Sequence, residues 1–475
     1  MNRSIARIFG LFTLLFAVLI GFTSEWSVFE ADALEDNTAN RRPLLEASQV
    51  PRGEILAADG TKLAVPEQIE GGESPRFTRR YPEGSLFSHS VGYFFIDSGA
   101  SGLERFYNDE LTGEGDELES LFGDFSGEEE GDDLATNLDP AGQRAAIEAL
   151  GGQAGSVVAI EPDTGKVRVM ASLPTYDPNA IPEQLDELNR ADGSPILNRA
   201  TQARYQPGST FKVITAAAAL DSGEFSPETL VDGSSPAEIG GVPLENFEGE
   251  AGGTVPLSEA LTRSVNTAFA RIGEQLGTDT MFEYMDRFAF FSEPPIDYPA
   301  DQLLPSGVFE GERLVRAGDP VDIGRVAIGQ ERLQVTPLQM AMVVQAIAND
   351  GVLMAPRLGD AVMGDDGRVL DRIGSSELSR VTSGESADAL TDMMVNVVAA
   401  GTGTNAQISG VDVAGKTGTA EIQGGLSNQA SFVAFAPADE PEVAIAVTVE
   451  ETQATGGDVA APIAKQVMEV LLSDE

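Results

Sequence analysis

The sequence predicts an α+β fold whose main sheet is assembled from both ends of a long C-terminal region. Two pairs of β-rich segments carry this prediction, 156–161 with 166–172 and 430–436 with 442–450, each joined by a turn containing proline. Between them the pattern is mostly helical, with helices expected at 209–220, 257–276, 337–349 and 386–400. Strands from distant parts of the chain with helices between them favour one α+β domain over residues 150–475.

The region before that domain is less regular and is expected to form a separate N-terminal domain over residues 29–149. Short strands are predicted at 54–57 and 90–96, and a helix at 142–150 after Asp139-Pro140. The acidic stretch 113–133 predicts a loop, because it has few β-branched residues. At the other end of the chain, a closing amphipathic helix is expected at 458–472.

The first residues indicate a membrane anchor. Arg3 and Arg7 precede an uncharged, strongly apolar run at 8–24, which reaches the lower length limit of a spanning helix. We expect a cytoplasmic tail at 1–7, a single transmembrane helix at 8–28 and a catalytic part outside the cytoplasm. A cleaved signal peptide is the alternative, since Ala31-Asp32-Ala33 resembles a cleavage site, although the apolar run is longer than a usual signal core.

Composition excludes several classes of chemistry. The formal net charge of -46 makes nucleic acid a poor partner. With no cysteine, the chain has no disulfides and no thiol nucleophile, and with His89 as its one histidine a Ser-His-Asp triad or a His-rich metal site is hard to build. His89 lies in an alternating stretch and is expected on a strand rather than at a catalytic site. No metal or cofactor is expected.

Three short motifs point to a serine nucleophile. Ser209 and Lys212 lie three residues apart at the start of a predicted helix, so both side chains fall on one face and the lysine can serve as base. Ser264 and Asn266 could point a hydroxyl and an amide into the same cleft. The third motif, residues 416–419, supplies a positive charge, two hydroxyls and a glycine, as Lys416, Thr417, Gly418 and Thr419. Together and in this order, the motifs are those of penicillin-binding proteins and serine β-lactamases.

The chain therefore resembles the class B penicillin-binding proteins over nearly its whole length, and within them the actinobacterial penicillin-binding protein A group. Further stretches that carry the resemblance are 51–55 (Pro-Arg-Gly-Glu-Ile), 102–104 (Gly-Leu-Glu) and 204–208 (Arg-Tyr-Gln-Pro-Gly). The resemblance implies a transpeptidase domain with a five-stranded antiparallel sheet flanked by helices, on an N-terminal pedestal with one transmembrane helix.

The resemblance also implies peptidoglycan cross-linking through an acyl-enzyme. Ser209 would attack the D-Ala-D-Ala bond of one stem peptide while Lys212 takes the serine proton. Ser264 would relay a proton to the leaving amine, and Asn266 would orient Lys212 and the substrate amide. An amine of a neighbouring stem peptide would then resolve the acyl-enzyme.

The resemblance further implies that the third motif binds the substrate. Lys416 and Thr417 would hold the substrate carboxylate, and the backbone N–H groups of Ser209 and Thr419 would bind the oxyanion. β-Lactam antibiotics, which mimic D-Ala-D-Ala, are expected to acylate Ser209. The stretch before the catalytic domain is too short for a glycosyltransferase domain, so the resemblance implies a separate membrane glycan polymerase of the RodA/FtsW type.

Several alternatives stay open at this point. A D,D-carboxypeptidase, a β-lactamase or sensor, and an inactive division scaffold share some or all of these features. Residues 410–417 also match the phosphate-binding loop of nucleotide hydrolases, but Gly424-Gly425 interrupts the helix that such a loop requires. The segment 401–406 resembles a dinucleotide fingerprint but follows a helical pattern. Residues 429–432 depart from the His-Ala-Trp-like stretch common in the family.

Overall fold

The computed structural model describes residues 2–24, 50–69, 76–113, 130–316, 318–364, 366–422 and 427–473. The first helix, α1, covers Asn2–Ser24. Within these ranges, no helix has the combination of length and hydropathy expected of a membrane span. Most of the acidic stretch predicted as a loop, residues 114–129, lies outside the described residues.

A five-stranded antiparallel sheet joins the two ends of the C-terminal region, as the sequence predicts. Its order is β20-β21-β22-β7-β8, and every neighbouring pair is antiparallel. The strands are β7 (Gly155–Ile160), β8 (Val167–Leu173), β20 (Ala414–Ile422), β21 (Ser427–Ala436) and β22 (Val443–Thr452). Because β20 is an edge strand, one of its sides is free to face other parts of the domain.

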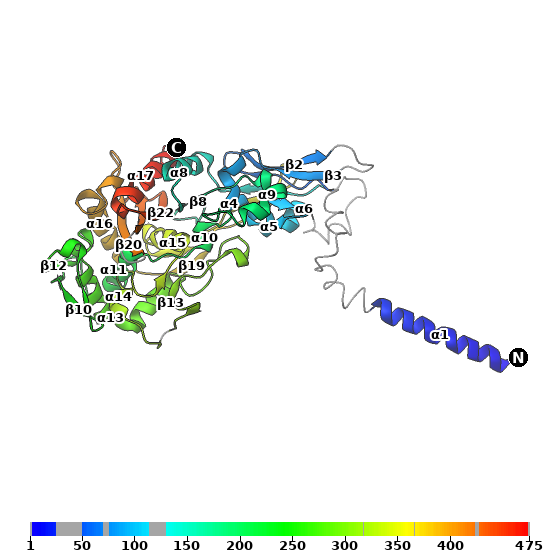
Figure 1. Ribbon diagram of the computed structural model, residues 1–475, viewed down its shortest axis with the longest axis horizontal. Helices are drawn as coiled ribbons and strands as arrows, with labels where there is room; N and C mark the ends of the chain where they lie inside the picture. Colours follow the sequence, from blue (N-terminus) through cyan, green and yellow to red (C-terminus); the bar gives the residue numbers. More distant parts are fainter. Residues whose placement is uncertain are drawn as a thin grey trace.

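Helices cover both faces of this sheet (Figure 1). Side chains alternate along each strand, so Val157 packs into one core cluster and Val158 into another. The first cluster lies under α8 (Pro140–Leu150) and α17 (Ala461–Leu471), which contact each other. The second lies under α11 (Lys212–Asp221), α13 (Asn266–Arg287), α15 (Pro337–Ala348) and α16 (Gly384–Ala400).

A second sheet, with six strands, supports the N-terminal region. Its order is β18-β17-β6-β1-β2-β3, and the β1–β6 pair is parallel, so this sheet is mixed. The strands are β1 (Ile55–Leu56), β2 (Lys62–Ile69), β3 (Arg76–Arg80), β6 (Asp133–Thr136), β17 (Gly359–Met363) and β18 (Val369–Arg372). The last two strands return from late in the chain and tie the N-terminal region to the rest of the molecule.

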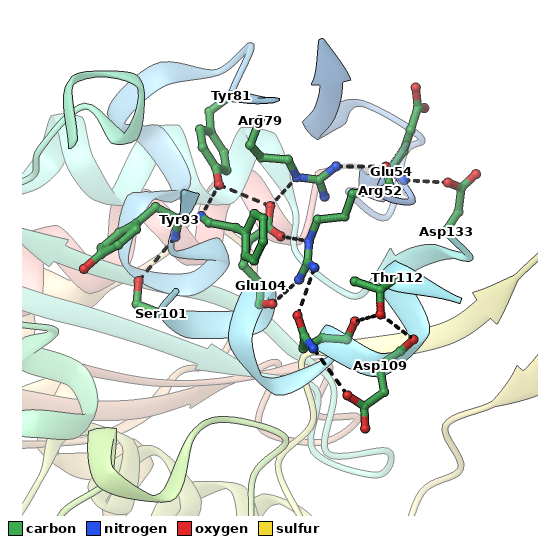
Figure 2. Close-up of polar contacts among 12 residues, drawn as sticks. Arg52, Glu54, Arg79, Tyr81, Tyr93, Ser101, Glu104, Asp109, Thr112 and Asp133 are labelled. Atoms are coloured by element: carbon green, nitrogen blue, oxygen red, sulfur yellow. Dashed lines mark hydrogen bonds and ion pairs between the residues drawn. The ribbon is translucent and has the colours of Figure 1, made fainter. Parts of the chain in front are cut away.

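A buried ion cluster stabilises the N-terminal region (Figure 2). The carboxylate of Glu104 is fully buried and is paired with the guanidinium groups of Arg52 and Arg79. Tyr81 donates a hydrogen bond to the same carboxylate at 3.2 Å. Burial alone would raise the pKa of Glu104, but the two arginines hold it below its ordinary value. The Glu104 carboxylate thus holds together Arg52 and Arg79, which lie well before it in the sequence.

Most predicted elements are present, and three differ. The predicted strand 90–96 is wrong, because His89 lies in a short helix, α4 (Ser88–Val91), and only β4 (Phe94–Phe95) is extended. The single helix expected at 257–276 is two, α12 (Leu257–Thr262) and α13, separated by a break at Ser264. The closing helix begins as one π-helical turn at 456–460 before α17.

The remaining elements are short. The helices are α5 (Gly102–Phe106), α6 (Asn108–Thr112), α9 (Ile181–Leu188), α10 (Arg199–Gln202) and α14 (Ile323–Val326). The strands are β5 (Gly99–Ala100), β9 (Leu230–Asp232), β10 (Ala237–Ile239), β11 (Val242–Leu244), β12 (Thr254–Pro256), β13 (Gly307–Glu310), β14 (Arg313–Leu314), β15 (Leu333–Gln334), β16 (Val352–Met354) and β19 (Glu377–Arg380).

Candidate active site

Ser209 lies at the entry to a buried helix. A 3-10 turn, Gly208–Phe211, leads directly into α11, whose first nine residues are all buried. Ser209 itself is only partly buried, whereas Lys212, one turn later, is fully buried. The spacing of the two residues thus gives the expected arrangement of an accessible hydroxyl above a desolvated amine.

The amine of Lys212 is held by the second motif. Its Nζ donates to the backbone oxygen of Ser264 at 2.8 Å, to Ser264 Oγ at 3.2 Å and to Asn266 Oδ1 at 2.8 Å. Among the described residues, the Ser209 hydroxyl has no hydrogen-bond partner, so the structure does not join it to Lys212. Contacts of this kind often tighten only when substrate binds.

The break between α12 and α13 places Ser264. Its backbone has φ 58, a left-handed conformation that non-glycine residues rarely adopt. That turn directs both the carbonyl and the hydroxyl of Ser264 at Lys212 and starts α13 at Asn266. The Ser264 hydroxyl and the Asn266 amide therefore both contact Lys212, and the left-handed backbone at Ser264 lies at the break between the two helices.

The third motif lies on the edge strand β20. Lys416 is fully buried, and its Nζ donates to Ser264 Oγ at 2.9 Å and to the backbone oxygen of Thr417 at 3.0 Å. The side chain of Thr417 lies 2.6 Å from Thr402 Oγ1, and Thr419 Oγ1 accepts from the N–H of Gly456 at 3.1 Å. All three motifs therefore meet, with Ser264 Oγ between the two lysines.

Electrostatics separate the roles of the two lysines. Burial, and then repulsion by Lys416, lowers the pKa of Lys212 well below its ordinary value. Burial lowers the pKa of Lys416 to about 7. The lowered pKa of Lys212 favours its neutral form, which can accept a proton, and Lys416 changes charge near physiological pH.

Glycine at 418 lets β20 approach the nucleophile segment. A Cβ at Gly418 would lie 2.7 Å from the backbone oxygen of Pro207 and 2.9 Å from Thr210 Cγ2. Such a contact is too short for any real side chain, so the two segments can be this close only at glycine. The third motif therefore lies directly beside the turn that carries Ser209.

Two groups of residues near the site were not predicted. Thr402, which contacts Thr417, belongs to the stretch that resembles a dinucleotide fingerprint. Glu450 accepts hydrogen bonds from Tyr205 and, at 3.1 Å, from Arg199, and so fixes the start of the nucleophile segment. The family motif at 204–208 could have pointed to Tyr205. No local pattern in the sequence pairs Glu450 with Tyr205, because the two residues lie far apart in the chain.

The nucleotide interpretation fails on geometry. Lys416 and Thr417 lie inside strand β20, which continues to Ile422. A phosphate-binding loop needs a helix whose first N–H groups face the phosphates, and a strand does not supply them. The structure thus agrees with the exclusion made from Gly424-Gly425, although residues 423–426 lie outside the described ranges.

Comparison with known proteins gives consistent results. The family model of the penicillin binding protein transpeptidase domain matches residues 155–469, and that of the penicillin binding protein A dimerisation domain matches residues 52–130. The chain is 35% identical to the peptidoglycan D,D-transpeptidase PbpA of Mycolicibacterium smegmatis and 34% identical to that of Mycobacterium tuberculosis, over the full length of each chain.

Solved structures agree in fold. The penicillin G acyl-enzyme complex of penicillin-binding protein A from M. tuberculosis has a TM-score of 0.81 and 33% identity, covering 89% of this chain and 100% of the other. The D,D-transpeptidase domain of a peptidoglycan glycosyltransferase from Eggerthella lenta has a TM-score of 0.79 and 33% identity, covering 89% and 98%. The predicted architecture of the catalytic domain is thus confirmed.

Proposed function

This chain belongs to the family of penicillin-binding protein transpeptidases, and we propose that Ser209, Lys212 and Ser264 carry out its acyl transfer. It is a serine-type peptidoglycan D,D-transpeptidase that acts in cell-wall synthesis. The observation that carries the assignment of residues is the position of Ser264 Oγ, 3.2 Å from Nζ of Lys212 and 2.9 Å from Nζ of Lys416.

Acylation begins at the partly buried Ser209. The neutral amine of Lys212 accepts the proton of the hydroxyl as its oxygen attacks the carbonyl carbon of the D-Ala-D-Ala bond. Asn266 keeps the amine in place through its Oδ1. The backbone N–H groups of Ser209 and Thr419 stabilise the negative charge that develops on the substrate oxygen.

The C–N bond then breaks and the amine leaves with a proton. Ser264 Oγ passes a proton toward the leaving nitrogen and is replenished from the Lys212 ammonium, which it contacts. Lys416 and Thr417 hold the terminal carboxylate of the substrate, and Gly418 allows that end of the peptide to approach the backbone of β20. An amine of a second stem peptide attacks the ester carbonyl, the C–Oγ bond breaks, and Lys212 passes the proton of that amine to Oγ, which regenerates Ser209.

The N-terminal segment is proposed as a membrane anchor. The support is the uncharged apolar run 8–24 that follows Arg3 and Arg7. The proposed order is a cytoplasmic tail at 1–7, a transmembrane helix at 8–28, a pedestal at 29–149 and an extracytoplasmic transpeptidase domain at 150–475. A membrane glycan polymerase of the RodA/FtsW type is the proposed partner, because cross-linking needs newly made glycan strands.

The test of the residue assignment is covalent labelling. The full-length chain is incubated with a fluorescent penicillin, and the adduct is measured by intact mass. A long-lived adduct is expected for the unchanged chain and for the control Ser375→Ala at an exposed serine, and none for Ser209→Ala. Labelling of the folded Ser209→Ala variant would refute Ser209 as the nucleophile, and rapid drug turnover would indicate a β-lactamase instead.

A further inference from the structure

A cavity separate from the catalytic motifs lies where the N-terminal region meets the transpeptidase domain. Its volume is about 330 Å³. His89, Tyr93 and Ser101 line it from the N-terminal side, and Tyr176 and Tyr298 from the other. This volume is in the range of small-molecule sites, which favour the junctions between domains.

The cavity wall is uncharged. Among the described residues that line it, there is no aspartate, glutamate, lysine or arginine. His89 donates from Nε2 to the backbone oxygen of Pro195 at 2.8 Å, and burial lowers its pKa to about 4, so it is neutral at physiological pH. In a chain of net charge -46, such a wall suits a neutral ligand.

Hydrogen bonds fix the aromatic part of the wall. The Tyr176 hydroxyl donates to the backbone oxygen of Ser88 at 2.8 Å. The Tyr298 hydroxyl donates to the backbone oxygen of His89 and accepts from Asn198 Nδ2 at 3.2 Å. These rings are held in place without a ligand, so binding costs little ordering of the wall.

Other polar groups on the wall have spare hydrogen-bonding capacity. Tyr93 is 8% exposed, and no described residue hydrogen-bonds its hydroxyl, which Figure 2 shows pointing away from the buried ion cluster. Gln202 and Gln302 use Oε1 to accept backbone N–H groups of Asn198 and Gly102, each at 3.1 Å. No partner among the described residues takes their Nε2 groups. One phenol and two amide donors therefore remain for a ligand.

We propose that this cavity binds one neutral, N-acetylated amino-sugar unit of a glycan strand. Tyrosine rings pack against the apolar faces of a sugar, while phenol and amide groups bond its hydroxyl and acetamido oxygens. A neutral wall with unused donors matches that chemistry, because it offers no positive charge to a phosphate or a carboxylate and would leave its donors unpaired against a hydrocarbon. The choice of a glycan rather than another sugar rests on the proposed function, in which the substrate is peptidoglycan.

The cavity is continuous with the segment that carries the nucleophile. Asn198 and Gln202 lie at the two ends of α10, and the chain runs on from there through Tyr205 to Ser209. Arg199, within α10, and Tyr205 both donate to Glu450. A glycan bound here therefore touches the same rigid segment that presents Ser209.

The test is a binding titration of the full-length chain with N,N′-diacetylchitobiose, followed by saturation-transfer NMR. Specific transfer to the acetamido methyl protons is expected. Tyr93→Phe, which keeps the ring and removes the free hydroxyl, should weaken binding about three- to tenfold. Asn189→Trp fills the rim from an exposed position and should abolish binding, while the exposed control Asn396→Trp on α16 should leave it unchanged.

Three results would overturn the inference. They are no transfer at millimolar saccharide, binding that survives Asn189→Trp, and equal affinity for maltose, which lacks the acetamido groups. Penicillin labelling of the same sample separates this inference from the assignment of Ser209. Labelling without sugar binding refutes the sugar site alone, and sugar binding without labelling refutes the assignment of the nucleophile alone.

Discussion

The side-chain nitrogen of Lys416 lies 2.9 Å from the hydroxyl oxygen of Ser264, and that of Lys212 lies 3.2 Å from the same oxygen. Both lysines are fully buried, and the charge on Lys416 disfavours a second charge on Lys212. The two nitrogens around this hydroxyl therefore favour one positive charge over two. The consequences of that distribution can be measured.

The rate constant for acylation by penicillin should fall on both sides of a maximum. On the acid side Lys212 becomes protonated and can no longer accept the Ser209 proton. On the alkaline side Lys416, whose pKa burial lowers to about 7, loses the charge that holds the ligand carboxylate. Acylation of the full-length chain measured from pH 5 to 10 should therefore decline above about pH 7.

The control for that profile is Lys465→Gln on α17, a lysine outside the three motifs. Its profile should superimpose on that of the unchanged chain. A rate that keeps rising to pH 10 would mean that the charge of Lys416 plays no part in binding.

Lys416→Met should stabilise the protein while abolishing acylation. The folded state lowers the pKa of Lys416 from 10.5 to about 7, so burying its charge destabilises the protein fully at and below pH 7. As the pH rises from 7 towards 10.5, Lys416 is neutral in the folded state, and the free-energy cost of burying its charge shrinks. The variant should therefore be about 1–3 kcal/mol more stable at pH 6, with the lost hydrogen bonds offsetting part of the gain.

Urea denaturation at pH 6 and pH 9 measures this difference. The gain in unfolding free energy of Lys416→Met over the unchanged chain should be smaller at pH 9 than at pH 6. A variant equally destabilised at both values would show that the contacts of Lys416 to Ser264 and Thr417 outweigh the burial of its charge.

Gly418→Ala should reduce acylation about 100-fold and destabilise the protein by about 1–3 kcal/mol. The added Cβ would lie 2.7 Å from the backbone oxygen of Pro207, so β20 must move away from the turn that presents Ser209. Gly374→Ala is the matched control, because nothing lies within 4 Å of a Cβ there. Stopped-flow acylation of both variants measures the effect, and equal rates would contradict the requirement for close approach.

The chemistry was predictable where it is local. The spacing of Ser209 and Lys212 places both on one helix turn, and hydrophobic patterns locate the hairpins of the five-stranded sheet. The break at Ser264 was not predicted, because apolar residues keep their helical spacing across it. The left-handed backbone at that residue, whose carbonyl accepts from Lys212, lies between the two helices.

Long-range pairing was also beyond the sequence. The contact between Ser264 and Lys416 spans 152 positions, and β17 and β18 join the N-terminal sheet from more than 200 positions away. No local pattern specifies a partner at such distances. At His89 a local pattern is misleading, because its alternating neighbours suggest a strand. The residue lies instead in helix α4, where its ring contacts Tyr176 and the backbone oxygen of Pro195.

Glu104→Ala should destabilise the N-terminal region by about 3–5 kcal/mol, because it leaves the buried guanidinium groups of Arg52 and Arg79 without a counter-charge. The two arginines hold the pKa of Glu104 below its ordinary value, so its contribution is present above the unfolded pKa of a glutamate and is lost as the pH falls through the folded value. Urea denaturation at pH 7 compares this variant with Glu187→Ala, an exposed control on α9 expected to change stability by less than about 0.5 kcal/mol. A Glu104→Ala protein as stable as that control would mean that the arginines find water or other partners, and the cluster would then not be what holds the N-terminal region together.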